Sequence, residues 1–229
     1  MIIAAILAGG KGERVGGTTP KQLLMLGDKP VIQWSVDTFH QDKQIDEIII
    51  VSEKSSLPAI RSIFPEIKYP KITAIIEGGI ERVDSSANAV FYKDYKYDDI
   101  FMIHDAARPF ISTSIIHELI NAVKKHDAAG VYIPAKDTIA IVDNEIIDSI
   151  PERNRMFYTQ TPQAFRYSLI MEAHKSYQLN RARGITDDVS LVASSGHDIH
   201  VVSGSDLNFK ITTELDYKIA NLIAGNILL

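Results

Sequence analysis

Short apolar runs that alternate with helical patterns are the feature of this chain that most constrains its fold. The runs that predict strands lie at residues 2–7, 45–52, 71–79, 98–109, 128–135 and 199–204. The helical patterns lie at residues 29–41, 55–64, 82–93, 112–126, 167–182 and 213–229. Strands that alternate with helices in this order predict an α/β fold, in which helices cover both faces of a largely parallel sheet.

The alternation is interrupted once, between residues 136 and 156. There, period-two stretches flank an Asp-Asn turn, the pattern of a β-hairpin rather than of a crossover helix. We expect residues 1–229 to form a single domain, because α/β folds of this size often do. We expect residues 136–156 to protrude from it as an arm that contacts a second copy of the chain, since the hairpin carries apolar residues.

Composition argues against several functional classes. A net charge of -5 argues against a general nucleic-acid surface. The apolar first ten residues lack a basic flank and are far shorter than the roughly 20 residues of a membrane span. The chain has no cysteine, which suits a reducing cytoplasm, and its seven histidines show no zinc spacing. We therefore expect a cytoplasmic protein with no nucleic-acid partner, no membrane partner and no metal held by its own side chains.

The connection after the first strand, LAGGKGERVGGTTPKQ at residues 7–22, holds five of the 13 glycines. Such a loop lies at the carboxyl end of a parallel strand, where ligands collect, and its glycines let backbone N–H groups approach an anion. The dinucleotide pattern GxGxxG fails because Val15 replaces its third glycine, and the Walker pattern fails because no Gly-Lys-Ser/Thr ends the loop. Arg14 and Lys21 add two cations, so the loop predicts a different phosphate site; a tight turn with solvated charges is the alternative.

Six motifs resemble, in order and spacing, the cytidylyltransferases that attach CMP to a phosphorylated polyol. They are LAGGKGERVGGTTPKQ, GGIERVDSSANAV, IHDAARPF, TQTPQAF, TDDVSLV and NFKITTELD. The resemblance spans residues 2–221 and implies a Rossmann-like, mostly parallel twisted sheet of the nucleotidyltransferase (GT-A-like) class with a protruding β-arm. It also implies a homodimer joined by the arm, with CTP and a polyol phosphate as the small-molecule substrates.

The resemblance implies that an acceptor phosphate attacks the α-phosphorus of CTP and releases pyrophosphate. Because two anions must meet, cations must offset their repulsion and stabilise the transition state. The residues implied in catalysis are Arg14, Lys21, Arg153 and Lys210. Those implied in substrate binding are Leu7, Ala8, Gly9, Gly10, Lys11, Gly12, Gly79, Ser85, Asp105, Ala106, Arg108 and Thr138. Mg²⁺ is implied as a cofactor held mainly by the CTP phosphates.

Within this set, the resemblance assigns the triphosphate to the backbone of residues 8–12 and cytosine to Gly79 and Ser85. Ile80 departs from relatives that carry a polar residue there. The alternatives are an exposed Ser85 in a strand-to-helix turn and an Asp105 that caps a helix or turn, although the end of a buried strand is where a carboxylate that meets ribose, acceptor or magnesium is expected.

The same resemblance implies that the acceptor is bound and positioned by Asp105, Arg108, Thr138, Arg153 and Lys210. It also implies that Arg108 or Thr138 comes from the partner subunit. Taken alone, Arg153 on a hairpin and Lys210 in a strand read as surface charges. Residues 186–188, TDD, either contact the acceptor pocket or cap a helix.

The motifs divide on the identity of the acceptor. HDAARPF, TQTPQAF and TDDVSL look more like enzymes that make CDP-methylerythritol for isoprenoid synthesis. LAGG, DTIA and ERNRMF look more like enzymes that make CDP-ribitol for wall or capsule polymers. We favour methylerythritol phosphate, with ribitol 5-phosphate as the alternative.

Two other classes of function are weighed against the enzyme. A non-catalytic CTP-binding protein could share the fold, because fold does not fix function. Against it, the chain retains Arg14, Lys21, Asp105, Arg153 and Lys210 together. A nicotinamide-binding domain is disfavoured by the missing third glycine.

Overall fold

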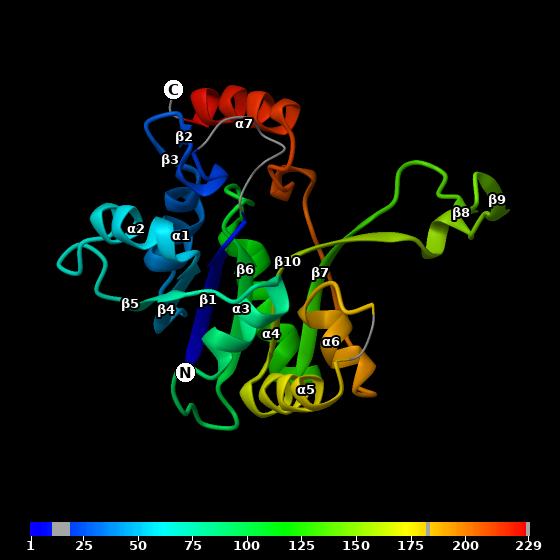
Figure 1. Ribbon diagram of the computed structural model, residues 1–229, viewed down its shortest axis with the longest axis horizontal. Coiled ribbons are helices and arrows are strands. Elements are labelled where there is room, and N and C mark those ends of the chain that lie inside the picture. Colours follow the sequence, from blue (N-terminus) through cyan, green and yellow to red (C-terminus); the bar gives the residue numbers. More distant parts are fainter. Residues whose placement is uncertain (11–18, 182–183, 228–229) are drawn as a thin grey trace.

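The computed structural model describes residues 1–10, 19–181 and 184–227. A seven-stranded sheet forms its centre, in the order β11-β7-β10-β6-β1-β4-β5 (Figure 1). Its strands are β1 (Ile2–Ala8), β4 (Glu47–Ser52), β5 (Ile72–Glu77), β6 (Ile100–Asp105), β7 (Ala128–Pro134), β10 (Phe157–Arg166) and β11 (His200–Ser203). The expected mostly parallel α/β fold is confirmed.

One strand runs against the others. β10 pairs antiparallel with both β6 and β7, whereas β1 pairs parallel with β4 and β6. The sequence pattern did not indicate a strand here, because the segment is polar and contains Pro162. Its position between two buried strands, rather than its own hydrophobic pattern, accounts for its burial.

Helices cover both faces of the sheet (Figure 1). One face carries α1 (Val31–Gln41), α2 (Leu57–Ile63) and α4 (Thr113–His126). The other carries α3 (Arg82–Val90), α5 (Tyr167–Asn180) and α6 (Asp188–Ser194). This double cover explains why β1 is an unbroken apolar run, since both of its faces are buried.

A third, smaller apolar cluster lies beyond the carboxyl end of β1 (Figure 1). It joins α7 (Glu214–Ile227) and the short strands β2 (Met25–Leu26) and β3 (Lys29–Pro30) to the start of α1. The single-turn helices are η2 (Lys21–Leu23), η3 (Lys54–Ser56), η4 (Arg153–Arg155) and η5 (Asp206–Asn208). Lys21 begins η2, and Lys210 lies between Phe209 and Ile211, which both pack in this cluster.

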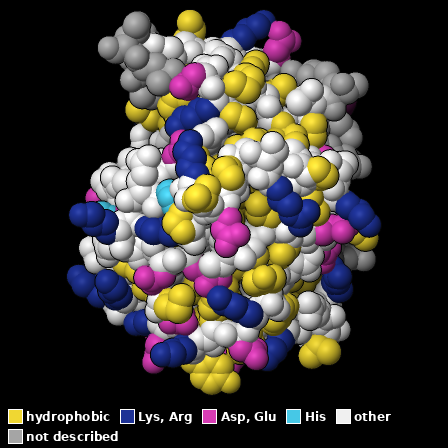
Figure 2. Space-filling model, turned by 90° about the vertical axis from the view of Figure 1, so that its left-hand side faces the viewer, with side chains coloured by type: hydrophobic (Ala, Val, Ile, Leu, Met, Phe, Trp, Pro, Cys, Tyr) yellow, Lys and Arg dark blue, Asp and Glu magenta, His cyan; other side chains and the backbone are white. Residues whose placement is uncertain are grey.

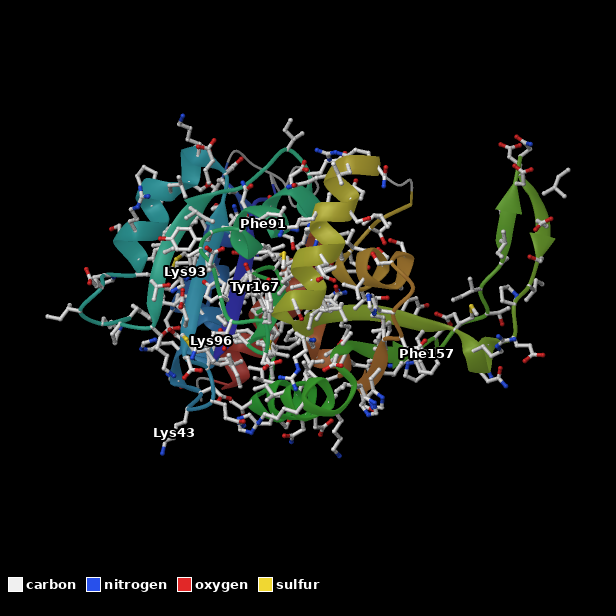
Figure 3. All side chains as sticks on the ribbon, turned by 90° about the horizontal axis from the view of Figure 1, so that it is seen from below. Lys43, Phe91, Lys93, Lys96, Phe157 and Tyr167 are labelled. Carbon is white, nitrogen blue, oxygen red and sulfur yellow. The ribbon has the colours of Figure 1, made fainter. Side chains whose placement is uncertain are left out.

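A β-arm projects from the body between β7 and β10 (Figure 1). It holds the antiparallel strands β8 (Ile141–Asp143) and β9 (Ile146–Ser149). The turn falls at Asn144 and Glu145, whose φ angles are 48° and 65°, as a primed hairpin turn requires. Phe157, labelled in Figure 3, lies at the root of the arm.

On the face seen in Figure 2, Lys and Arg side chains are interspersed with Asp and Glu rather than gathered in one patch. In the described part of the chain, every helix is too short or too polar to cross a membrane.

Candidate active site

A cavity of about 360 Å³ opens at the carboxyl ends of β1 and β6. Its lining residues are Leu7, Gly9, Gly10, Lys21, Gly79, Ile80, Glu81, Arg82, Ser85, Asp105, Ala107 and Lys210. From β1 the chain proceeds to β4 and β5 on one side of the sheet and then crosses to β6 on the other. The cavity therefore lies at a topological switch point, where open α/β sheets bind their ligands.

Glycines form one wall of the cavity, and at Gly79 no larger residue fits. A Cβ atom added to Gly79 would lie 2.2 Å from the Cβ of Asp84. The Gly79 N–H instead donates a hydrogen bond of 3.1 Å to Ser85 Oγ, and Ser85 Oγ donates to the Glu81 carbonyl at 3.2 Å. Glu81 and Asp84 form a capping box that starts α3. The turn after β5 is thus held tightly against the helix.

Asp105 is the buried carboxylate of the cavity, at the end of β6. Its Oδ1 accepts from Arg82 Nε at 3.1 Å and its Oδ2 accepts from Lys210 Nζ at 2.7 Å. Burial opposes ionisation, but the positive charges of Arg82, Lys210 and Arg108 outweigh it and hold the pKa of Asp105 well below its usual range. Asp105 is therefore an anion that keeps two cations in fixed positions.

Lys21 and Lys210 reach the cavity from the cluster around α7. Lys21 Nζ donates to the Ile211 carbonyl at 3.2 Å, and Lys21 Cε lies 3.3 Å from the position of a Cβ built on Gly10. The Ile211 N–H in turn donates to the Ala107 carbonyl at 2.8 Å. The two lysines therefore come from segments that are tied to each other and to the end of β6. Lys210 lies outside the regular strands, so the expectation of a strand there was wrong.

Arg108 and Ala106 follow Asp105 but do not line the cavity. The Arg108 guanidinium donates to the carbonyls of Asn208 at 2.9 Å and Thr159 at 3.3 Å. Ala106 is buried. In this single chain, Arg108 joins the end of β6 to β10 and η5.

His104 is buried and hydrogen-bonded. Its Nε2 lies 3.1 Å from the Arg108 carbonyl and its Nδ1 lies 3.2 Å from Thr161 Oγ1. Burial lowers the pKa of His104 to about 4, so the ring is neutral at physiological pH. Its hydrogen bonds support the loop that carries Asp105.

The structure brings some of the sequence-derived site residues together and leaves others apart. The predicted residues that meet at the cavity are Leu7, Gly9, Gly10, Lys21, Gly79, Ser85, Asp105 and Lys210. The buried Ala8 lies beside the cavity at the end of β1. Thr138 and Arg153 are exposed on the arm and do not line the cavity of their own chain. Lys11, Gly12 and Arg14 lie outside the described residues.

Arg82 is a residue of the cavity that the sequence analysis missed. It is the first residue of α3, where a cation is unfavourable to the helix dipole. Burial would lower its pKa, but Asp188 and Asp105 raise the pKa of Arg82 above its ordinary value. A cation in the first helical turn, three positions after Gly79, was the available signal. Asp188, bound to Arg82 Nη1 at 2.7 Å, comes from the TDD motif.

The two aspartates of the TDD motif at residues 186–188 have different structural roles. Asp187 caps α6 by accepting from the Ser190 N–H at 2.9 Å, which matches the helix-cap alternative. Asp188 turns inward and is fully buried against Arg82. Neither residue lines the cavity.

Comparison with known proteins identifies the family of the chain. The sequence profile of the 2-C-methyl-D-erythritol 4-phosphate cytidylyltransferase family matches residues 2–226. The chain belongs to this family. A cytidylyltransferase of that name from Thermosipho melanesiensis is 40% identical over 232 residues, which span 99% of this chain and 100% of that protein. The family is one of nucleotidyltransferases, so the expected enzyme class is confirmed.

Two further relatives bear on fold and acceptor. A crystal structure of 4-diphosphocytidyl-2C-methyl-D-erythritol synthase from Anaerococcus prevotii superposes with a TM-score of 0.86 at 30% identity, and the match covers 98% of both chains. A bifunctional ribulose 5-phosphate reductase/CDP-ribitol pyrophosphorylase from Haemophilus influenzae is 39% identical over 96% of this chain. The match covers 47% of that longer protein.

Proposed function

We propose that this cytidylyltransferase transfers CMP from CTP to the phosphate of 2-C-methyl-D-erythritol 4-phosphate and releases pyrophosphate. The product, CDP-methylerythritol, is an isoprenoid precursor. The observation that carries the proposal is the cavity at the switch point, where Lys21 and Lys210 meet a wall of glycines. Membership of the family over residues 2–226 supports the choice of reaction.

The proposed chemistry uses the charges of the cavity directly. An oxygen of the acceptor phosphate forms a bond to the α-phosphorus of CTP while the bond from that phosphorus to the departing pyrophosphate oxygen breaks. Lys21 and Lys210 offset the repulsion between the two anions and the charge that develops in the transition state. Asp105 and Arg82 hold Lys210 in place. The backbone next to Gly9 and Gly10 receives the phosphates.

We propose that Mg²⁺ arrives with CTP. Among residues 1–10, 19–181 and 184–227, no group of three His, Cys, Asp or Glu side chains could hold a metal ion. Asp105 is the buried carboxylate of the cavity, and its two oxygens already accept from Arg82 and Lys210. This donor set fits an ion held mainly by nucleotide phosphates, with Asp105 as its nearest protein carboxylate. Mg²⁺ would supply neutralisation of phosphate charge.

Ribitol 5-phosphate is the second candidate acceptor. The relative named CDP-ribitol pyrophosphorylase is 39% identical, against 40% for the Thermosipho cytidylyltransferase. This difference is too small to separate the two by identity. The profile match to the methylerythritol phosphate family favours that acceptor.

Pyrophosphate release tests both candidates in one experiment. The protein is incubated with CTP, Mg²⁺ and either 2-C-methyl-D-erythritol 4-phosphate, ribitol 5-phosphate or a hexose 1-phosphate. We expect the highest kcat/KM with the first acceptor. A higher value with ribitol 5-phosphate would transfer the proposal to CDP-ribitol synthesis. Activity with the hexose 1-phosphate alone would refute it.

We also propose a cytoplasmic homodimer joined by the arm, with the absence of cysteine in keeping with a reducing compartment. Five apolar side chains of the arm are at least half exposed: Ile141, Val142, Ile146, Ile147 and Ile150. An isolated two-stranded hairpin is marginally stable, and a second copy of the same arm would bury these side chains. In such a dimer, Thr138 and Arg153 would approach the acceptor site of the partner.

Sedimentation tests the dimer. Ile146→Ser combined with Ile147→Ser should shift the sedimenting mass from two chains to one, because both side chains lose apolar contact area. Leu179→Ser is the control, since Leu179 is exposed on α5, away from the arm. A wild-type protein that sediments as a monomer at micromolar concentration would contradict the proposal.

A further inference from the structure

A buried chain of polar side chains leads from the cavity into the helices α3, α5 and α6. Arg82 donates from Nε to Asp105 and from Nη1 to Asp188 Oδ2, the latter at 2.7 Å. Asp188 Oδ1 accepts from Ser86 Oγ at 2.5 Å, and Ser86 Oγ lies 3.1 Å from His174 Nε2. Asp188, Ser86 and His174 are all fully buried. Only Arg82 and Asp105 of these five line the cavity.

Hydrogen bonds fix both the side chain and the backbone of Asp188. Its backbone N–H and that of Val189 both donate to Gln163 Oε1 at 3.0 Å, which fixes the first turn of α6 against β10. Since Ser86 gives its single proton to Asp188, His174 Nε2 donates to Ser86 Oγ. Burial lowers the pKa of His174, which is consistent with a neutral ring that carries this proton on Nε2. A rigid, fully buried carboxylate thus faces one cation, Arg82.

The two carboxylates together fix the orientation of the Arg82 guanidinium. Asp105 alone would bind it through Nε and leave it free to pivot about that contact. Asp188 binds Nη1 on the other edge, so the plane of the group is determined. With Arg82 held on Oδ1 of Asp105, the other oxygen faces Lys210. The position of Lys210 therefore depends on an aspartate that lies outside the cavity.

We propose that Asp188 is a positioning residue for the transfer reaction, which acts through Arg82 on Asp105 and Lys210 and touches no substrate itself. The inference rests on the proposed function for its kinetic effect. Its geometric part, the control of Arg82 by Asp188, is independent of that function.

A double-mutant cycle with an adjacent control tests the proposal. The variants are Asp188→Asn, Arg82→Lys and the double variant, with Asp187→Asn as the control. Arg82→Lys keeps the positive charge next to Asp188 but cannot bridge two carboxylates with a planar fork. Asp187→Asn alters the same helix end and the same residue type without contact to Arg82. The measurements are kcat and KM for both substrates, CTP affinity by calorimetry, thermal unfolding and a crystal structure of Asp188→Asn.

Both variants are assayed below their unfolding temperatures. We expect Asp188→Asn to lower kcat/KM by about tenfold and Asp187→Asn to lower it by less than about twofold. On the Arg82→Lys background, Asp188→Asn should have no further effect, because its route to the cavity is already broken. Losses that multiply in the double variant, or equal losses in Asp187→Asn and Asp188→Asn, would overturn the proposal.

The crystal structure separates this proposal from the proposed function. We expect Arg82 in Asp188→Asn to leave Asp105, and an unchanged Arg82 contact would overturn the inference even if the enzyme is active. Wild-type protein without activity on any acceptor would refute the proposed function. The crystal structure of Asp188→Asn would still test whether Asp188 controls the position of Arg82. If Asp188→Asn does not fold, Ser86→Ala removes one donor to Asp188. It should give a smaller loss of kcat/KM that also vanishes on the Arg82→Lys background.

Discussion

Replacing Asp105 by Asn should destabilise the protein by about 2 kcal/mol. Removing one partner of a fully buried ion pair costs about 3–5 kcal/mol, because the other charge is left buried. The Asp105 side chain is 9% exposed, but those of Arg82 and Lys210 are 25% and 36% exposed, so water solvates part of the freed charge. For a chain of this size, 1 kcal/mol shifts Tm by about 2–4 °C, which gives a decrease of about 4–8 °C.

The pH dependence of this loss follows from the lowered pKa of Asp105. Because its folded-state pKa lies below its unfolded value of 3.8, Asp105 contributes its full stabilisation above that unfolded value. The contribution is lost as the pH falls toward the folded-state pKa. The difference in stability between wild type and Asp105→Asn should therefore be constant from about pH 5 to 8 and narrow in stronger acid.

Thermal unfolding followed by circular dichroism measures this difference at several pH values. Asp206→Asn is the matched control, because Asp206 and Lys136 form an exposed ion pair of 2.8 Å. Such a pair contributes about 0–1 kcal/mol. A Tm for Asp105→Asn within about 1 °C of the control at neutral pH would refute the reasoning about Asp105, Arg82 and Lys210. So would a stability difference between wild type and Asp105→Asn that grows in acid.

Three further changes test other parts of the account. Lys21→Ala should lower kcat by about 10²-fold or more and weaken CTP binding much less, because its charge acts mainly in the transition state. Kinetics measures kcat and calorimetry measures CTP affinity. An equal loss of CTP affinity with unchanged kcat would make Lys21 a binding residue only. Gly79→Ala should weaken CTP binding, measured by calorimetry, by about tenfold, because the added Cβ would lie 2.2 Å from the Cβ of Asp84. Gly225→Ala is the control: its added Cβ meets no neighbouring atom, so CTP affinity should be unchanged. Ser112→Ala removes the N-cap of α4 and should lower the free energy of unfolding by about 1 kcal/mol in a denaturant titration, with kcat unchanged.

Local patterns predicted most of the fold because the central strands β1, β4 and β6 are buried on both faces. The short apolar run before Gly9 is typical of a covered strand, and the Asp143-Asn144 pair indicated the turn of the arm. β10 escaped prediction for the opposite reason. Its residues are polar, and its place in the sheet is set by β6 and β7 rather than by its own periodicity.

The candidate site shows the same division. The glycine loop and the neighbourhood of Lys21 indicated phosphate chemistry from local sequence alone. Arg82 did not stand out because its partners, Asp105 and Asp188, are 23 and 106 positions away in the chain. The role that we propose for Arg153 requires a second chain, and the position of a second chain cannot be predicted from a pattern within one sequence.

Isotope labelling tests the central claim most directly. The acceptor 2-C-methyl-D-erythritol 4-phosphate is prepared with ¹⁸O in its phosphate and incubated with the protein, CTP and Mg²⁺, and both products are analysed by mass spectrometry. The account predicts a product that carries CMP together with all of the label, and unlabelled pyrophosphate. Label in the pyrophosphate, or a product without CMP, would contradict transfer from the α-phosphorus of CTP to the acceptor phosphate.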